Sequence, residues 1–146
     1  MSTPISVDLS TIYLWFKRAV PNPTDKNRAV QIGCHFEEFG EMCDTLCIGA
    51  KFEEAVRNIA YFFKTECAGI DLNHAISREV LLDALCDQIV TAVGVAHMFG
   101  MDIQGALTEV NRSNWSKFVD GQPVFNEHGK IAKGPNYTKP DLTPFA

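Results

Sequence analysis

Residues 78–88, REVLLDALCDQ, place three acids inside an otherwise apolar segment. At 3.6 residues per turn, Glu79, Asp83 and Asp87 fall on one stripe of a helix. Burying this stripe among the neighbouring leucines would be costly unless a positive charge lies beside it. A divalent cation held by carboxylate oxygens meets that requirement. The stretch therefore predicts a long helix with a metal-binding role for its acids. One exposed edge of the helix is the alternative interpretation, and it is the less favoured of the two.

A second acidic segment, residues 35–42 (HFEEFGEM), carries Glu37, Glu38 and Glu41 on one side of a helix, across roughly 100 degrees of arc. Like charges at this spacing repel each other. A solvated helix face is the alternative interpretation, and for this segment alone the two weigh equally. Two acidic stripes in one small bundle favour a shared metal site. Neither segment has the Glu-x-x-His spacing of di-iron bundles, so Mg²⁺ or Mn²⁺ is the expected ion.

The bulk composition favours a globular protein and argues against nucleic-acid-binding, disulfide-rich and membrane-spanning classes. The chain has 146 residues and 46% hydrophobic content, which suits one globular domain. A net charge of -5 argues against a general nucleic-acid-binding surface. Five cysteines without a CxxC pair favour a reducing cytoplasm over a disulfide framework. The most apolar stretch, residues 84–101, contains Asp87 and His97, so we expect a core helix, not a membrane span.

Hydrophobic periodicity predicts an all-α bundle of about five helices. Asp8 or Ser10 is placed to cap the first helix, and Asp102 the last. The expected helices cover about residues 7–20, 25–48, 51–66, 72–99 (with a break near Ser77) and 102–115. The apolar face expected for the second helix consists of Ile32, Phe36, Phe39, Cys43, Leu46 and Cys47.

The helical period ends at Ser116. Asp120-Gly121 and residues 126–129 are turn signals, and the segments on either side of the second turn can pair as a short hairpin. The sequence thus predicts one domain, 1–146, with a helical core at about 7–116 and an irregular tail at about 117–146.

A third polar group spans the end of the last expected helix and continues into the tail. Residues 111–117, NRSNWSK, gather amides, hydroxyls and cations, and Lys130, Lys133 and Lys139 follow in the tail. Such side chains bind phosphate oxygens well, although an ordinary polar helix end explains the first segment equally well in isolation. With a metal ion bound by carboxylates on one side and these cations on the other, the protein would bind a polyphosphate between them.

The order Glu38-x-x-Glu41, then Asp83-x-x-x-Asp87, resembles the metal-binding acids of the MazG-like all-α nucleoside-triphosphate pyrophosphohydrolases. The C-terminal part is similar to phage-encoded, MazZ-type members of that superfamily, and the whole resemblance covers about residues 7–142. The stretches that carry the C-terminal similarity are 109–117, 120–123, 129–130 and 133–137.

The family's usual second element is Glu-x-x-Asp, and here Ala84 stands at the expected Glu position. Asp83, one residue earlier, or Glu79 would then supply the fourth ligand. The resemblance implies two or more Mg²⁺ ions per site, with Mn²⁺ able to substitute. The ligands it implies are Glu38, Glu41, Asp83 and Asp87.

The resemblance further implies hydrolysis of a (d)NTP to the monophosphate and pyrophosphate, by a homodimer or homotetramer. Some similar phage members act on dGTP and supply dGMP for 2-aminoadenine synthesis. We therefore expect dGTP as the substrate, a tail that covers it, a cytoplasmic location, and neither nucleic acid nor membrane as a partner.

Within that reaction, Glu37 or Glu38 would accept the proton of the attacking water. Tyr137 would either pack against the nucleotide or anchor the tail, with equal weight. Trp15 with Phe16, and Gln31 as a polar contact, are candidates for a base-binding slot, but a core role for the two aromatic residues is favoured. The expected phosphate contacts are Asn111, Asn114, Lys117, Lys130 and Lys133.

Two other functions remain open from the sequence. One is a dUTPase-like activity on the same helical fold. The other is a non-catalytic helical protein that binds a nucleotide and has kept the scaffold.

Overall fold

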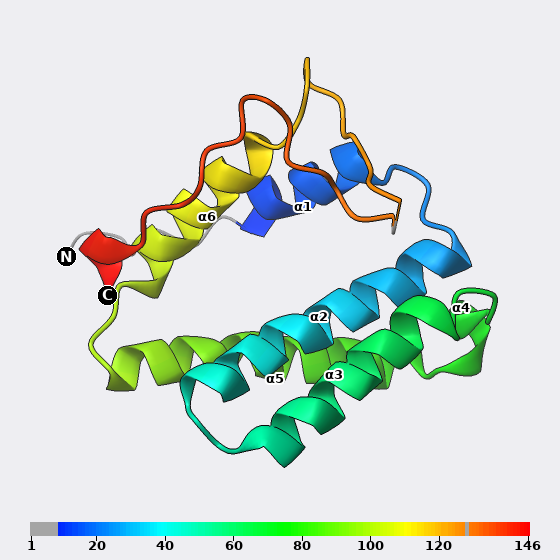
Figure 1. The fold of residues 1–146 in the computed structure, drawn as a ribbon, viewed down its shortest axis with the longest axis horizontal. Coiled ribbons are helices and arrows are strands. Elements are labelled where there is room, and N and C mark those ends of the chain that lie inside the picture. Colours follow the sequence, from blue (N-terminus) through cyan, green and yellow to red (C-terminus); the bar gives the residue numbers. More distant parts are fainter. Residues whose placement is uncertain (1–8, 128) are drawn as a thin grey trace. The chain divides into compact units, whose positions relative to one another are not determined.

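A computed structural model describes residues 9–127 and 129–146, and its regular structure is helical (Figure 1). The prediction of an all-α bundle of about five helices with an irregular tail is confirmed. The observed helices are α1 (Leu9–Ala19), α2 (Asp25–Thr45), α3 (Ala50–Thr65), α4 (Leu72–Ala75), α5 (Arg78–Met98), α6 (Ile103–Trp115) and the 3₁₀ helix η1 (Thr143–Phe145).

The helix ends agree with the sequence signals to within a few residues. The expected break near Ser77 divides the predicted fourth helix into the single turn α4 and the long helix α5. Asp102 caps α6, since its carboxylate accepts a hydrogen bond from the backbone N–H of Gly105 at 2.9 Å. Asp8, one of two caps expected for α1, lies outside the described residues.

Two compact units divide the chain. The first combines Met1–Pro21 with Glu79–Ala146, and the second is Asn22–Arg78. Each unit has its own cluster of buried side chains. The single domain expected from the sequence stays a prediction.

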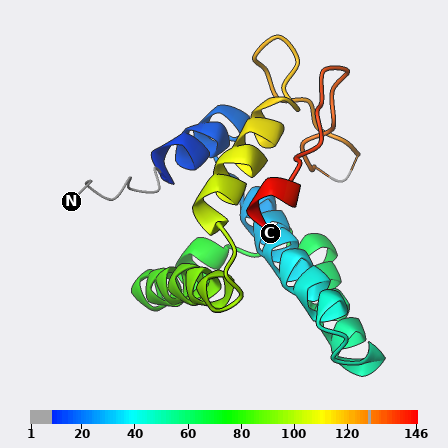
Figure 2. The same cartoon turned by 90° about the vertical axis from the view of Figure 1, so that its left-hand side faces the viewer.

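The second unit is an antiparallel pair, α2 and α3, closed by α4 (Figures 1 and 2). Thr24 and Asn27 start α2 with a reciprocal capping box: the Thr24 hydroxyl accepts from the Asn27 N–H, and the Asn27 amide oxygen accepts from the Thr24 N–H. At the α4 end, the core of this unit consists of Ala29, Cys67 and Leu72, with Ile32 and Phe63 packed against them.

Small residues set how closely α2 and α3 approach. A Cβ added at Gly33 would lie 2.7 Å from the backbone oxygen of Ala60, so glycine is required at that crossing. The expected apolar face of α2 is wrong at three of its six residues: Phe39 is 49% exposed, Leu46 is 56% exposed, and Cys47 is exposed as well. The contact with α3 instead buries small residues of α2, among them Gly33 and Gly40.

In the first unit, α1 packs against α6 (Figure 2). Trp15, Ala19 and Phe118 form its buried cluster, and Ile131 from the tail packs against them. The rings of Trp15 and Phe118 are stacked with centroids 5.6 Å apart. The tail is therefore part of this core, because it contributes Phe118 to the cluster and packs Ile131 against it.

The tail contains the predicted short hairpin. Phe125 and Ile131 form an antiparallel bridge, and the Ala132 N–H donates to the Val124 carbonyl at 2.6 Å. The predicted turn at Asp120-Gly121 is also present, with positive φ angles of 49° and 72° that glycine and aspartate tolerate best.

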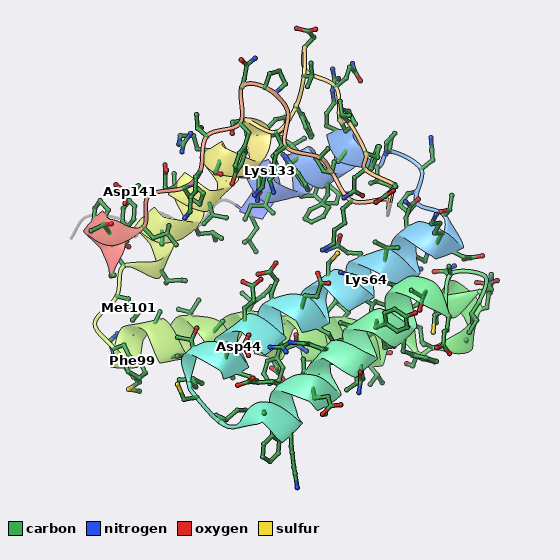
Figure 3. The ribbon with its side chains drawn as sticks, viewed as in Figure 1. Asp44, Lys64, Phe99, Met101, Lys133 and Asp141 are labelled. Carbon is green, nitrogen blue, oxygen red and sulfur yellow. The ribbon has the colours of Figure 1, made fainter. Side chains whose placement is uncertain are left out.

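Helix α5 is apolar around most of its circumference, and Ala96 is its buried residue. Large side chains on it are exposed, including Met98 at 82%, and Phe99 and Met101 just beyond its end are exposed as well (Figure 3). By length and composition α5 could cross a membrane. The buried core helix that the sequence predicted is not observed in the described residues, because only 6% of this span is buried.

Candidate active site

The acids of α2 do not share one environment. Glu37 is half-buried and forms an ion pair with Lys64 of α3, which Figure 3 shows beside α2. Glu38 and Glu41 are exposed. Of the two residues expected to accept a proton, Glu38 is thus the one whose carboxylate no lysine holds.

The acids of α5 resemble Glu38 and Glu41 in their setting. Asp83 and Asp87 lie one helical turn apart and both are exposed. The Thr91 hydroxyl donates a hydrogen bond to the backbone carbonyl of Asp87 at 2.8 Å. This bond does not involve the side-chain carboxylate of Asp87.

Several other acids of the chain are neutralised by a basic neighbour. In the described residues, by contrast, no hydrogen bond or ion pair uses the side-chain carboxylate of Glu38, Glu41, Asp83 or Asp87. Like charges one turn apart without a cation raise the free energy of the folded chain. Hard oxygen donors in such doublets fit Mg²⁺ or Mn²⁺. The neutralised acids are Asp25, Glu37, Asp44, Glu53 and Glu109.

The two carboxylate doublets belong to different units: Glu38 and Glu41 to one, Asp83 and Asp87 to the other. Within either unit, the described residues bring together no group of three or more His, Cys, Asp or Glu side chains that could hold an ion. One doublet suffices for a Mg²⁺ ion that keeps several waters, whereas the predicted shared site needs both. The shared site therefore stays a prediction.

The polar end of α6 is held by hydrogen bonds inside the first unit. The Asn111 amide donates to the Thr11 hydroxyl of α1 at 3.0 Å. The Lys117 ammonium donates to the Asn114 side-chain oxygen at 2.8 Å. These bonds orient Asn114 and Lys117 together, which gives one amide and one cation side by side at the end of the helix.

The tail lysines differ in their surroundings. Lys133 is exposed, and its ammonium lies 5.0 Å from the centre of the Tyr137 ring (Figure 3). Lys130 is half-buried in the hairpin, where its backbone N–H donates to the Asn126 side chain at 3.0 Å. Tyr137 thus contacts a lysine of the tail itself, and both roles expected for its ring stay predictions.

The candidates for a base-binding slot belong to different units. Trp15 is 8% exposed in the core of the first unit, and its indole N–H donates to the Asn114 carbonyl at 2.9 Å. This is the core role that the sequence favoured for Trp15, whereas the same expectation is wrong for Phe16, which is 38% exposed. Gln31 is an exposed residue of α2 in the second unit.

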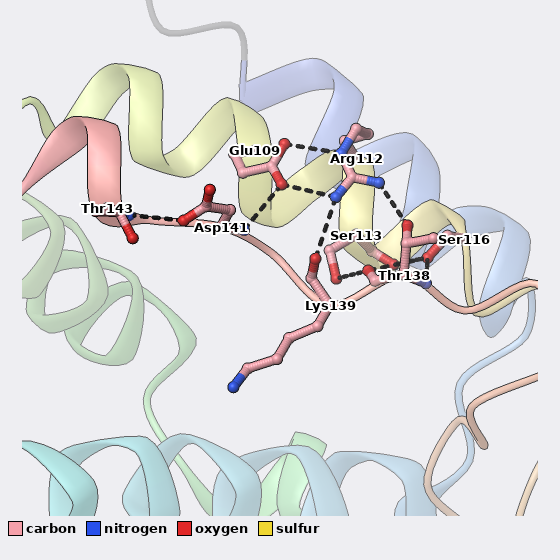
Figure 4. Close-up of polar contacts among 8 residues, drawn as sticks. All are labelled: Glu109, Arg112, Ser113, Ser116, Thr138, Lys139, Asp141 and Thr143. Carbon is pink, nitrogen blue, oxygen red and sulfur yellow. Dashed lines mark hydrogen bonds and ion pairs between the residues drawn. The ribbon is translucent and has the colours of Figure 1, made fainter.

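A polar cluster between α6 and the tail was not expected from the sequence (Figure 4). Arg112 donates to both carboxylate oxygens of Glu109, at 2.7 and 2.6 Å, and to the Thr138 hydroxyl at 2.6 Å. The Glu109 carboxylate also accepts from the backbone N–H of Asp141 at 3.1 Å. The i, i+3 spacing of Glu109 and Arg112 is a sequence signal for the ion pair, but nothing in the sequence points to the tail segment.

These contacts perturb ionisation in the cluster. The Arg112 guanidinium, helped by the Asp141 N–H, lowers the pKa of Glu109 from 4.5 to about 2. Hydrogen bonds from Thr143, first its hydroxyl and then its N–H, lower the pKa of Asp141. The Glu109 carboxylate in return raises the pKa of Arg112. The Glu109 and Asp141 carboxylates and the Arg112 guanidinium are therefore charged at neutral pH.

No family model, curated protein or solved structure matches this chain.

Proposed function

We propose that this protein is a metal-dependent (d)NTP pyrophosphohydrolase, with dGTP as the foremost substrate and dGMP and pyrophosphate as the products. The observation that carries the proposal is the presence of two carboxylate doublets, Glu38 with Glu41 and Asp83 with Asp87, that have no cationic partner among the described residues. In a phage setting, this reaction would shape the nucleotide pool toward 2-aminoadenine synthesis.

The doublets are the residues that would hold the metal. When bound, Mg²⁺ or Mn²⁺ would neutralise charge on the triphosphate and on the leaving pyrophosphate. The chemistry of the donor set fits this role, since carboxylates at one-turn spacing are hard oxygen ligands that a cation relieves of mutual repulsion. We propose two or more ions per site, as the family resemblance implies.

Glu38 is the proposed proton acceptor. A water molecule attacks the α-phosphorus in line, its proton passes to the Glu38 carboxylate, and the bond from the α-phosphorus to the bridging oxygen breaks. The leaving pyrophosphate takes the electron pair of that bond. Glu37 would have to give up its ion pair with Lys64 to act in the same way, which makes it the less suitable base.

The cations of the first unit are the proposed phosphate contacts. Lys117 and Asn114 present an ammonium and an amide at the end of α6, and Lys133 presents a second ammonium from the tail. Lys130 and Asn111 complete the proposed group. Positive charges and amide donors of this kind stabilise the negative charge that develops on the phosphate oxygens.

The test is turnover by the pure protein with Mg²⁺ and, separately, with each common NTP, each dNTP and dUTP, with products resolved by chromatography. Monophosphate and pyrophosphate formed foremost from dGTP supports the proposal. Activity on dUTP alone would favour the dUTPase-like alternative. Absence of turnover with either Mg²⁺ or Mn²⁺ would favour the non-catalytic binding protein.

A pair of variants tests the site itself. Glu41→Gln removes one charge of a doublet, while Glu54→Gln removes a charge from an exposed acid of α3 that has no like-charged partner one turn away on the sequence. Loss of turnover in the first variant only, with unchanged circular dichroism, supports the assignment. Undiminished Mg²⁺ binding by Glu41→Gln would contradict it.

We further propose that the protein acts in the cytoplasm as a homodimer or homotetramer. The support for an oligomer is the apolar surface of α5, where side chains such as Val80, Val90 and Met98 are exposed and would gain stability from further packing. The support for the cytoplasm is that all five cysteines are free thiols. Light scattering coupled to size exclusion measures the mass directly. A monomer at micromolar concentration would contradict this part of the proposal.

A further inference from the structure

The last segment of the chain, residues 138–145, lies along α6 and is held there by hydrogen bonds; we call this segment the strap. Thr138 lies beside the end of the helix: its carbonyl accepts from the Ser113 hydroxyl at 2.8 Å, and its N–H donates to the Ser116 hydroxyl at 2.9 Å. Further on, the Phe145 carbonyl accepts from the N–H of Asp102, at the start of the same helix, at 2.9 Å. The tail therefore runs back along α6 from its end to its beginning (Figure 4).

Arg112 is a charged residue of α6 that contacts this strap. Its guanidinium uses Nε and Nη2 on Glu109, Nη1 on the Thr138 hydroxyl, and Nη2 again on the Lys139 carbonyl at 3.4 Å. Arginine is the residue best suited to bidentate phosphate binding, and Arg112 is the only arginine after residue 78. In this structure the Arg112 guanidinium is bound to the Glu109 carboxylate. We therefore assign the phosphate contacts of this unit to lysines.

The start of the strap adjoins the turn that carries one of those lysines, Lys133. Thr138 follows Tyr137 in the chain, and the Tyr137 ring lies under the Lys133 ammonium. Between them, the Tyr137 N–H closes a turn onto the Gly134 carbonyl at 3.1 Å. A Cβ at Gly134 would lie 3.0 Å from the Lys117 carbonyl, so this turn rests against the end of α6. A continuous set of contacts thus joins Arg112 to Lys133.

We propose that Arg112 is a positioning residue of the active site: by fixing Thr138 on α6, it holds the turn that presents Lys133 to the triphosphate. This inference rests on the proposed function. Arg112 itself touches no substrate in this arrangement, because binding a phosphate would require it to leave Glu109.

The test is a double-mutant cycle on the full-length protein, with steady-state kinetics on the Mg²⁺ complex of dGTP. We expect Lys133→Ala and Arg112→Ala each to raise KM about tenfold while kcat changes less than about threefold. Because Arg112 acts through Lys133, the double variant is expected to show a rise of about tenfold, not the roughly hundredfold rise that independent effects would produce. Arg57→Ala, which removes an exposed ion pair to Asp44 in the second unit, is the control and should leave KM unchanged.

Two further measurements separate positioning from general stability. Amide hydrogen exchange in residues 134–141 should accelerate in Arg112→Ala and not in Lys133→Ala. Thr138→Val keeps the shape of the side chain and removes one bond from Arg112, so it provides a milder variant if Arg112→Ala unfolds. Its KM increase should likewise vanish in the Lys133→Ala background.

The outcomes are distinct. Multiplicative KM effects of Arg112 and Lys133 in an active enzyme would overturn the positioning role and leave the proposed function intact. A wild-type KM in Arg112→Ala or Thr138→Val would overturn it too. Wild-type protein that turns over no nucleotide would overturn the proposed function, and the positioning role with it.

Discussion

Lys64 of α3 forms an ion pair with Glu37 of α2 while its aliphatic stem lies over Gly33, one turn earlier on α2. The two contacts come from one side chain, and both join the same pair of helices. The stem needs the space that glycine leaves, and the ammonium group needs Glu37. This pair therefore ties the packing of the second unit to the acidic segment of α2.

The close crossing at Gly33 predicts a large effect of a small substitution. In Gly33→Ala the new Cβ would lie 2.5 Å from Lys64 Cγ and 2.7 Å from the Ala60 backbone oxygen, and the backbone oxygen cannot move aside. We expect the free energy of unfolding to fall by about 1–3 kcal/mol, measured by urea denaturation. Gly40→Ala on the same helix meets Val56 at an ordinary 3.4 Å and should be neutral or stabilising by up to about 1 kcal/mol. Equal effects of the two substitutions would contradict the close crossing.

The ion pair at Glu37 predicts different roles for two adjacent glutamates. Glu38→Gln should lower kcat on dGTP by about 10²–10⁴-fold, because it removes a carboxylate that we propose both to hold the metal and to accept the proton. Glu37→Gln should lower kcat by less than about tenfold, since that carboxylate is committed to Lys64. Steady-state kinetics of both variants, with circular dichroism to verify the fold, decides between them. The reverse order of effects would assign the base to Glu37.

The pKa of Glu109 predicts how stability depends on pH. It is lowered from 4.5 to about 2 in the folded protein, so at pH 3 to 4 the unfolded chain binds a proton that the folded chain does not. The stabilising contribution of Glu109 is therefore complete above about pH 4.5 and is lost as the pH falls toward 2. The melting temperature of the wild type should exceed that of Glu109→Gln at pH 6, and the difference should shrink below pH 4. A difference that is constant from pH 6 to pH 2.5 would contradict the pairing of Glu109 with Arg112.

The two tryptophans form a matched pair for the core of the first unit. Trp15→Phe removes the indole donor to the Asn114 carbonyl at a buried position and should cost about 1–3 kcal/mol of stability. Trp115, which is 38% exposed, packs edge-on against Phe118 and keeps that contact as Phe, so its substitution should cost no more than about 1 kcal/mol. Chemical denaturation measures both. A Trp15→Phe variant of wild-type stability with a raised KM would place Trp15 in the base-binding slot instead.

The helical fold was predictable because its determinants are local. The capping position of Asp102, the break near Ser77 and the Asp120-Gly121 turn each depend on a few neighbouring residues, and each appears as expected. The apolar face of α2 was less predictable. Hydrophobicity pointed to Phe39 and Leu46, whereas the approach of α3 selected glycines, which a hydrophobic pattern cannot detect.

The candidate site divides in the same way. The sequence by itself determined which acids stand one turn apart on which helices, because helical periodicity alone assigns Glu38, Glu41, Asp83 and Asp87 to stripes. Only the tertiary structure decided that Lys64 holds Glu37 and that Arg112 holds the tail through Thr138. Both contacts join residues more than 20 positions apart in the chain, and their formation depends on helix packing and chain reversal, which no local pattern encodes.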